Sequence, residues 1–267
     1  MKLAITGSSS GIGYSIAKSL LESGHEIWGI ARSPQTEFSK LFPNTFHSTI
    51  CDVSKLEDVE SAANAILKTW GKLNGLITCA GTQGEIGKTF TTDPSAWTNT
   101  ITSNLSGTYN SLRMIYPLLK KSETRIKLIC FSGGGATKAR SHFSAYAAAK
   151  TAIVRLVETI AEEEKMTALD INAVAPGAIN TRLTDEVVKL GPSKVGATEY
   201  DAAVIQKQNG GQSLDKVIEL THWLLSEKSD GISGKLISAQ WDDFTQLKAQ
   251  EGILKNPDTY TLRRITT

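Results

Sequence analysis

A glycine-rich segment near the start of the chain places the strongest limit on its fold. It reads TGSSSGIG from Thr6 to Gly13, follows a short apolar run and opens an amphipathic stretch that ends at Gly24. This order predicts a strand, a tight turn and a helix. The N-terminus of such a helix carries unpaired backbone N–H groups and the positive end of the helix dipole, which together bind anions.

The residue types in this segment favour a dinucleotide site over an ordinary turn between a strand and a helix. Gly7 permits the tight turn, Gly11 lets the backbone approach a pyrophosphate, and Gly13 lets the helix pack close to the sheet. A lone glycine pattern also occurs in plain turns, so the strand before it and the helix after it carry the prediction. The neighbouring residues of the same loop are then candidate cofactor contacts: Ser9, Ser10 and Ile12.

Apolar runs that suit β-strands alternate with helical patterns along the rest of the chain. We expect strands at residues 3–5, 25–31, 46–50, 73–78, 126–131, 168–174 and 235–239, and helices at 56–70, 95–119, 144–164 and 214–225. Near-continuous apolar strands alternating with helices predict a doubly wound α/β fold, in which a parallel sheet is covered on both faces. Ligands of such folds bind beyond the carboxyl ends of the strands.

Length and composition suit one soluble domain. The chain has 267 residues, 40% of them hydrophobic, and a net charge of +2, so composition offers no case for nucleic-acid binding. We see neither a signal peptide nor an apolar run near membrane-spanning length, and therefore expect a cytoplasmic protein. We expect one domain over residues 1–239, with an irregular substrate loop at 176–213, and a separate tail over residues 240–267.

The cysteines and histidines give no sign of a metal site. The three cysteines are far apart and sit in or beside apolar runs, which favours buried, reduced thiols: Cys51, Cys79 and Cys130. The four histidines lack the spacing of metal ligands: His25, His47, His142 and His222.

Tyr146 and Lys150 stand one helical turn apart and form the candidate catalytic pair. The spacing alone is weak evidence, because two further pairs share it: Tyr14 with Lys18, and Tyr116 with Lys120. Context favours Tyr146, since its helix follows a strand that ends in Ser132 and three glycines. Upstream, Asn104 interrupts another helical segment, where an inward amide needs hydrogen-bond partners.

With these motifs in this order, the chain resembles the short-chain dehydrogenase/reductase family in its single-domain form, from Lys2 to about Ala239. The resemblance implies a Rossmann fold of about seven strands, a nicotinamide cofactor, and a homodimer or homotetramer. It implies that Tyr146 donates or accepts the proton, that Lys150 binds the nicotinamide ribose, and that Asn104 supports a water relay. It implies cofactor contacts from Gly7, Gly11, Gly13, Asp52, Val53, Ala80, Gly81, Pro176, Gly177, Ile179 and Thr181.

The proposed chemistry accounts for these residue types. Hydride transfer to a carbonyl carbon leaves an alkoxide that needs a proton. A free tyrosine has a pKa of about 10 and is a poor partner near neutral pH. A neighbouring ammonium and an oxidised nicotinamide both favour the phenolate.

The serine that polarises the substrate carbonyl is out of place. The family has it 13 residues before the tyrosine, where this chain has Gly133, and Ser132 lies one residue earlier. Either the three glycines after Ser132 absorb the one-residue shift, so that Ser132 takes the role, which we favour, or the site lacks the serine. Ser141 and Ser144 are weaker substitutes, because they approach or enter the next helix as caps. The chain also departs from the family pattern after the fourth strand, at Thr78-Cys79, and at its C-terminal end.

Arg32 and Ser33 follow the second strand, where an acidic residue would bind the 2′-hydroxyl of NAD(H). A guanidinium here pairs with a 2′-phosphate, so we expect NADP(H), with NAD(H) as the alternative. The polar residues of 176–213 favour a small polar substrate. We therefore predict an NADP(H)-dependent oxidoreductase that interconverts a carbonyl and an alcohol. The alternative is a dinucleotide-binding regulatory or scaffold protein with impaired catalysis.

Overall fold

The computed structural model describes residues 1–247, 256 and 258–264. It contains one parallel sheet of seven strands in the order β3-β2-β1-β4-β5-β6-β7, as the alternating pattern predicts. The strands are β1 (Lys2–Thr6), β2 (Glu26–Ala31), β3 (Phe46–Ile50), β4 (Gly75–Thr78), β5 (Ile126–Phe131), β6 (Leu169–Ala175) and β7 (Leu236–Ser238).

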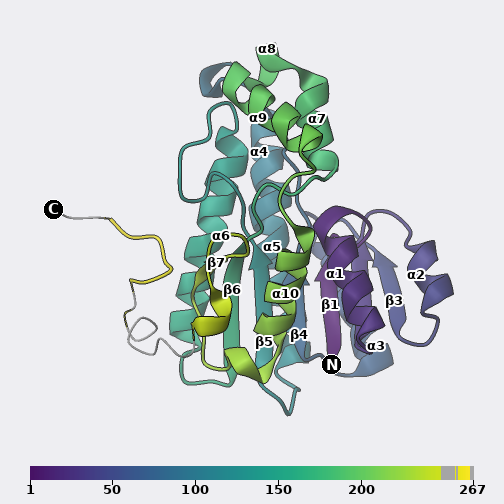
Figure 1. Ribbon diagram of the computed structural model, residues 1–267. Coiled ribbons are helices and arrows are strands. Elements are labelled where there is room, and N and C mark those ends of the chain that lie inside the picture. Colours follow the sequence, from purple (N-terminus) through teal and green to yellow (C-terminus); the bar gives the residue numbers. More distant parts are fainter. Residues whose placement is uncertain (248–255, 257, 265–267) are drawn as a thin grey trace.

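Helices cover both faces of the sheet (Figure 1). They are α1 (Gly11–Glu22), α2 (Thr36–Leu41), α3 (Leu56–Trp70), α4 (Pro94–Ile101), α5 (Gly107–Leu119), α6 (Ser144–Glu163), α7 (Arg182–Leu190), α8 (Pro192–Val195), α9 (Ala197–Gln208) and α10 (Leu214–Leu225). A π-helical turn (Thr102–Ser106) joins α4 to α5, and short 3₁₀ turns lie at Thr89–Thr91, Glu227–Ser229 and Phe244–Gln246.

Alternating side chains of the strands build two cores, one on each face. Leu3 and Ile5 of β1 pack with buried residues of α1 and α10, whereas Ala4 between them packs with α3, α5 and α6. Because both faces of the inner strands are buried, their positions favour apolar residues, which explains the near-continuous apolar runs. The edge strand β3 is more exposed and more polar. No helix among the described residues combines the length and apolar character needed to cross a membrane.

The strand order reverses between β1 and β4, and this point positions the site. The chain runs outward from β1 to β3 on one side and from β4 to β7 on the other. Loops leave the carboxyl ends of β1 and β4 in opposite directions and open a crevice between them. Residues that follow β1, β2, β4 and β6 converge there.

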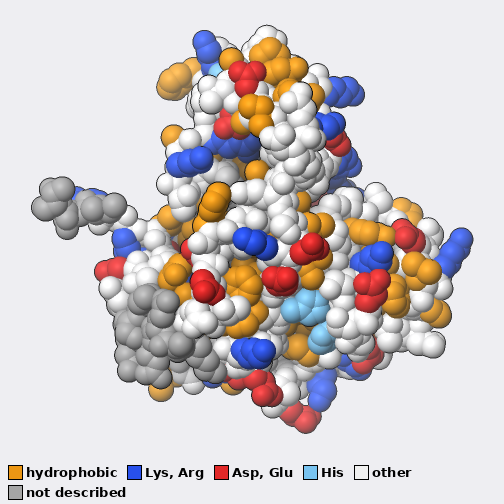
Figure 2. Space-filling model, in the orientation of Figure 1, with side chains coloured by type: hydrophobic (Ala, Val, Ile, Leu, Met, Phe, Trp, Pro, Cys, Tyr) orange, Lys and Arg blue, Asp and Glu red, His pale blue; other side chains and the backbone are white. Residues whose placement is uncertain are grey.

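The stretch 176–213 is helical, so the expectation of an irregular loop is wrong. It holds α7, α8 and α9, which stand as a lobe above the rest of the surface in Figure 2. Val187, Val195 and Ala203 are buried between these helices, and Lys207 pairs with Asp185 across them at 2.7 Å. The polar composition of residues 176–213 suggested a loop because α7, α8 and α9 each bury only a few apolar side chains.

The described part of the tail packs on the domain. Phe244 is buried against Trp223 of α10, with 5.7 Å between ring centroids. Farther along, the Tyr260 carbonyl accepts a hydrogen bond from Leu236 N of the edge strand β7, and Lys235 Nζ donates to the carbonyls of Asn256 and Thr259. This segment therefore occupies hydrogen-bonding groups beside the exposed edge of the sheet.

Candidate active site

The glycine-rich loop leaves the start of α1 open to a ligand. Ser10 precedes the helix without capping it through its side chain, and the first turn holds no acidic residue. Gly7 has φ +70°, and a Cβ there would lie 2.7 Å from the backbone N of Ala80. A Cβ on Gly13 would lie 2.4 Å from the Gly7 carbonyl oxygen. The close packing that was expected at these glycines is therefore present, and the uncapped amides at the start of α1 are donors of the kind that bind anions.

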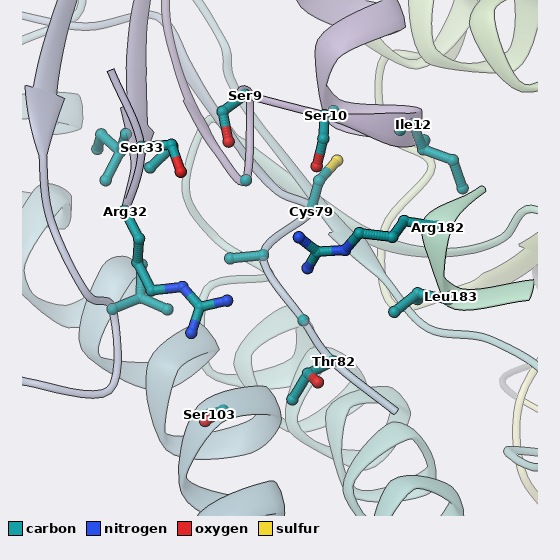
Figure 3. A pocket seen from close by; sticks show the side chains of 18 of the residues that line it. Ser9, Ser10, Ile12, Arg32, Ser33, Cys79, Thr82, Ser103, Arg182 and Leu183 are labelled. Carbon is teal, nitrogen blue, oxygen red and sulfur yellow. The ribbon is translucent and has the colours of Figure 1, made fainter. Parts of the chain in front are cut away.

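The cleft beside this loop brings most of the predicted cofactor residues together (Figure 3). Those that line it are Gly7, Ser9, Ser10, Gly11, Ile12, Gly13, Arg32, Ser33, Asp52, Val53, Ala80, Gly81 and Thr181. It is also lined by residues that were not predicted to contact the cofactor: Ile30, Ala31, Cys79, Thr82, Ser103, Arg182 and Leu183. Arg182 and Leu183 directly follow Thr181, which was predicted to contact the cofactor, so their position in the sequence was a usable signal.

Five predicted cofactor residues do not line this cleft: Tyr146 and Lys150 of α6, and Pro176, Gly177 and Ile179 at its β6 side. The Pro176 carbonyl accepts a hydrogen bond from Gln240 Nε2. Gly177 has φ +86°, and a Cβ there would lie 2.2 Å from Gln212 Oε1. Ile179 is buried in the core. This segment is therefore held by contacts from the start of the tail, which sequence motifs did not indicate.

Tyr146 is buried at the start of α6. Burial raises the pKa of its phenol, and the positive charge of Arg140 opposes that effect. Tyr146 is 8% exposed, and it is not among the residues that line the cleft beside the glycine-rich loop. Tyr146 and Lys150 lie on one side of α6, with the ammonium 5.7 Å from the ring centroid.

Lys150 is held from the strand side of α6. Its Nζ donates a 2.9 Å hydrogen bond to the Phe131 carbonyl at the end of β5. Burial lowers the pKa of Lys150 to about 8, while its proximity to the thiols of Cys79 and Cys130 acts in the opposite direction. A Cβ on Gly81 would lie 3.5 Å from this Nζ, so the ammonium faces the Ala80–Gly81 backbone of the cleft.

Asn104 clamps two backbone segments next to the pair. Its Nδ2 donates to the carbonyls of Thr82 and Thr100, and its Oδ1 accepts from Thr82 N. Asn104 is fully buried in the π-helical turn, a geometry that recurs at functional sites. The amide therefore fixes the backbone that lines the cleft, while the water relay stays a prediction.

Ser132 does not face the tyrosine, so the expectation that it polarises the substrate carbonyl is wrong. Its hydroxyl is buried and donates a 3.0 Å hydrogen bond to the Lys150 carbonyl of α6. Gly133 occupies the position opposite the phenol, where a Cβ would lie 2.7 Å from Tyr146 Oη. Side chains alternate across β5, so a shift of one residue turns the serine toward the helix instead of the pocket.

Arg140 is the second cation beside Tyr146, and the sequence analysis missed it. Its guanidinium carbon lies 3.8 Å from the Phe143 ring centroid and 5.6 Å from that of Tyr146. Glu199 of α9 accepts from its Nε at 2.8 Å, and Gln83 Oε1 accepts from Nη1 at 3.2 Å. No local motif marks this arginine, because its partners come from distant parts of the chain.

The two other Tyr-x-x-x-Lys pairs have structural roles. Tyr14 stacks on Phe38 with 4.6 Å between ring centroids. Tyr116 Oη donates a 2.6 Å hydrogen bond to Glu164 Oε1, and burial with this bond raises its pKa to about 12. Neither tyrosine reaches the cleft.

The cysteines are free. Burial raises the pKa of the Cys51 thiol to about 12 and that of Cys130 to about 11. These thiols are therefore protonated near neutral pH and pack as small apolar groups.

A sequence profile of the short chain dehydrogenase family matches residues 2–190. The chain belongs to the short-chain dehydrogenase family. Members of this family are NAD(P)-dependent dehydrogenases and reductases, so this chain is an oxidoreductase of the carbonyl and alcohol class. The Rossmann fold and the cleft at the glycine-rich loop agree with that membership.

Curated relatives and solved structures resemble this dehydrogenase over most of its length. The short chain dehydrogenase pigC of Monascus ruber is 29% identical over 249 residues, 89% of this chain and 78% of that protein. D-beta-hydroxybutyrate dehydrogenase of Cupriavidus necator is 29% identical over 245 residues, 87% and 93% of the two chains.

Solved structures share the fold. The YIR035C protein of Saccharomyces cerevisiae superposes with a TM-score of 0.81 at 23% identity, covering 91% of this chain and 97% of that one. A Shigella flexneri 2a protein solved with NADP gives a TM-score of 0.76 at 22% identity, covering 90% and 96%.

Proposed function

We propose that this short-chain dehydrogenase interconverts a carbonyl and an alcohol on a small polar substrate with NADP(H), and that Tyr146 is its acid and base. One observation carries the proposal. The phenol of Tyr146 stands over Gly133 with Arg140 and Lys150 on the same ring, 5.6 and 5.7 Å from its centroid. Two cations beside one buried phenol favour the phenolate that proton transfer requires.

The cleft fits a dinucleotide that carries a 2′-phosphate. The uncapped start of α1 offers backbone amides to a pyrophosphate. Arg32 and Ser33 line the other end of the cleft. Asp52 accepts hydrogen bonds from the backbone and side chain of Ser54. Burial acts to raise the pKa of the Asp52 carboxyl, but these hydrogen bonds and the charge of Arg32 hold it below its usual range. These contacts support NADP(H), and NAD(H) is the alternative.

Tyr146 moves the proton in the proposed mechanism. A bound nicotinamide supplies or accepts the hydride. In reduction, the phenol gives its proton to the carbonyl oxygen as the carbon gains the hydride, and the phenolate regains a proton from solvent. In oxidation, the phenolate takes the alcohol proton. Lys150 binds the nicotinamide ribose and favours the phenolate by its charge.

Neither Ser132 nor Gly133 offers a hydroxyl to the substrate in this mechanism. Ser132 is committed to the Lys150 carbonyl, and Gly133 has no side chain to offer. Arg140 lies beside the Tyr146 ring and donates a hydrogen bond to Gln83, and these polar side chains support a substrate that carries polar groups. The polar residues of 176–213 contribute less than expected, because Lys194 pairs with Glu85 and Gln206 with Thr184.

The missing serine also favours a second candidate, a dinucleotide-binding regulatory protein with little turnover. NADPH oxidation on a panel of aldehydes, ketones, sugars and oxoacyl thioesters separates the two. We expect turnover, and we expect Tyr146→Phe to lower it by about 10²-fold or more while cofactor affinity stays within about twofold. Tyr14→Phe and Tyr116→Phe are matched controls that keep turnover. Tight NADPH binding with no turnover on the panel favours the regulatory protein.

The cofactor preference has its own test. Arg32→Ala is expected to weaken NADPH binding by about 1.5–3 kcal/mol with little effect on NADH, because the guanidinium has a charge-assisted contact only with the 2′-phosphate. Equal losses for both cofactors contradict the assignment.

We further propose a homodimer or homotetramer in the cytoplasm. Exposed apolar side chains of the described surface, among them Tyr109 of α5 and Trp241, support an interface. Light scattering at micromolar concentration tests the assembly, and a monomeric mass contradicts it.

A further inference from the structure

Two arginines enter the cofactor cleft from opposite sides, and only Arg32 belongs to the proposed 2′-phosphate site. Arg32 follows β2, whereas Arg182 is the first residue of α7. Both line the cleft, and both guanidinium groups extend into it in Figure 3. The guanidinium of Arg182 points toward the side of the cleft that carries Ser10, at the start of α1.

The backbone before Arg182 holds it against the glycine-rich loop. Thr181 caps α7, its Oγ1 accepting a hydrogen bond from Leu183 N at 3.3 Å. The Thr181 methyl carbon lies 3.5 Å from the place of a Cβ on Gly11. Arg182 therefore starts its helix within reach of the amides that form the anion site.

The charge of Arg182 is poorly matched to its place in α7. A cation at the N-terminus of a helix opposes the helix dipole. Its ion pair with Glu186 spans 3.3 Å at the surface, and its side chain is 67% exposed, so this pair contributes little. An anion bound in the cleft would satisfy both the guanidinium and the helix end.

The lining of the cleft carries more positive than negative charge. Its charged members are Arg32, Arg182 and Asp52, and both hydrogen bonds from Ser54 go to the Asp52 carboxylate. A ligand with two separate anionic groups complements this arrangement. A guanidinium binds phosphate oxygens in a bidentate manner, which suits each arginine to one group.

We propose that Arg182 binds the cofactor pyrophosphate from the side opposite the glycine-rich loop, and thereby ties the α7–α9 lobe to the bound dinucleotide. The inference rests on the proposed function, in which the cleft holds NADP(H). Arg32 then binds the 2′-phosphate and Arg182 the pyrophosphate. The lobe that packs beside Tyr146 is anchored when the cofactor is present.

Two fragments of the cofactor separate the arginines. ADP-ribose carries the pyrophosphate without a 2′-phosphate, and adenosine 2′-monophosphate carries the 2′-phosphate without a pyrophosphate. Calorimetric titration of the full chain compares wild type, Arg182→Met, Arg182→Lys and Arg32→Met. Lys189→Met, an exposed lysine at the other end of α7, controls for loss of a positive charge.

We expect Arg182→Met to weaken ADP-ribose and NADPH binding by about 10-fold or more and to leave adenosine 2′-monophosphate within about twofold. Arg32→Met has the reverse pattern on the two fragments, Arg182→Lys keeps part of the affinity, and Lys189→Met changes neither. Hydrogen exchange of α7 amides adds a second readout: ADP-ribose slows it in wild type and not in Arg182→Met.

Three results overturn the proposal. ADP-ribose affinity within about twofold of wild type in Arg182→Met shows that the arginine only pairs with Glu186. Equal losses for both fragments show a general field effect. Wild type that binds neither NADPH nor ADP-ribose overturns the proposed function together with this inference, whereas the first two results leave the proposed function standing.

Discussion

Gly133 sets how closely Tyr146, the proposed acid and base, approaches β5. A side chain at this position would meet Tyr146 Oη at 2.7 Å, which is closer than real contacts allow. The next residue, Gly134, has open space around the place of its Cβ. The site has therefore adapted to a glycine, and the tyrosine lies where a serine would otherwise stand.

Restoring the serine of the family pattern should lower activity. We expect Gly133→Ser to reduce kcat by about 10-fold or more, because it displaces the Tyr146 hydroxyl and a small misplacement is costly. Gly134→Ser is the matched control and should keep kcat within about twofold. Steady-state kinetics on a substrate found in the panel measures both. An increase of kcat in Gly133→Ser would show that the phenol moves to a working family geometry.

Arg140 opposes the effect of burial on the pKa of Tyr146. Burial raises the pKa of the phenol and Arg140 lowers it, so Arg140→Met should raise that pKa further. In this variant, the rate of alcohol oxidation, which requires the phenolate, then rises with pH at a higher midpoint than in wild type. The rate lost near neutral pH returns as the pH is increased. Lys150 also faces the ring, and Glu199 partly offsets Arg140.

Direct observation of the phenol tests this in the cofactor-free protein. Carbon-13 tyrosine labelling, assigned with Tyr146→Phe, gives the midpoint of Tyr146 by NMR. Arg140→Lys should keep a midpoint near that of wild type, and Arg155→Met on the outer part of α6 should not change it. An unmoved midpoint in Arg140→Met would limit Arg140 to a packing role.

The elements follow the sequence pattern except where tertiary contacts supply the missing burial. Strands 46–50 and 126–131 and the helices at 56–70 and 214–225 have the bounds that periodicity predicts. The α7–α9 lobe was interpreted as a loop because it is rich in polar residues, and its few buried apolar side chains lie where the helices pack on one another. The sequence pattern did not predict α2 either, because Phe38 is the one buried residue of this helix.

Phe244 anchors the first part of the tail to α10, and Trp241 does not. Phe244 is buried at the Trp223 ring, whereas Trp241 is 79% exposed. We expect Phe244→Ala to lower the free energy of unfolding by about 2–4 kcal/mol and Trp241→Ala by less than about 0.5 kcal/mol. Urea denaturation measures both. Equal small losses would mean that the tail contributes little to the domain.

Lys150 makes the stability of the whole molecule depend on pH. Burial lowers its pKa to about 8, against an ordinary value of 10.5. Between these values the unfolded chain binds one more proton at this residue than the folded chain, so the contribution to the free energy of unfolding rises with pH.

The difference between wild type and Lys150→Met isolates this contribution. We expect the free energy of unfolding of wild type, relative to the variant, to increase by about 2 kcal/mol from about pH 7.5 to about pH 9.5. Urea denaturation at each pH measures it. A flat or falling difference would show that the ammonium is not desolvated in the fold.

Local patterns were sufficient for the sheet, the glycine-rich loop and the Tyr146–Lys150 pair. Strand and helix periodicity depends on which face of each element is buried, and the loop and the pair are set by short spacings along the chain. The position of Arg32 and Asp52 in the cleft was also predictable from sequence. Both follow predicted strands, and the carboxyl ends of parallel strands meet at one edge of the sheet.

Only the tertiary structure decides three features of the site. They are the direction of the Ser132 side chain, the cations beside Tyr146, and the position of Arg182 across from the glycine-rich loop. A hydroxyl at the end of β5 can face either side of the sheet, and that of Ser132 donates its hydrogen bond to the Lys150 carbonyl of α6. Arg140 reaches Tyr146 because Glu199 and Gln83, distant in sequence, hold it there. Such contacts join residues that only packing brings together, and no spacing along the chain encodes them.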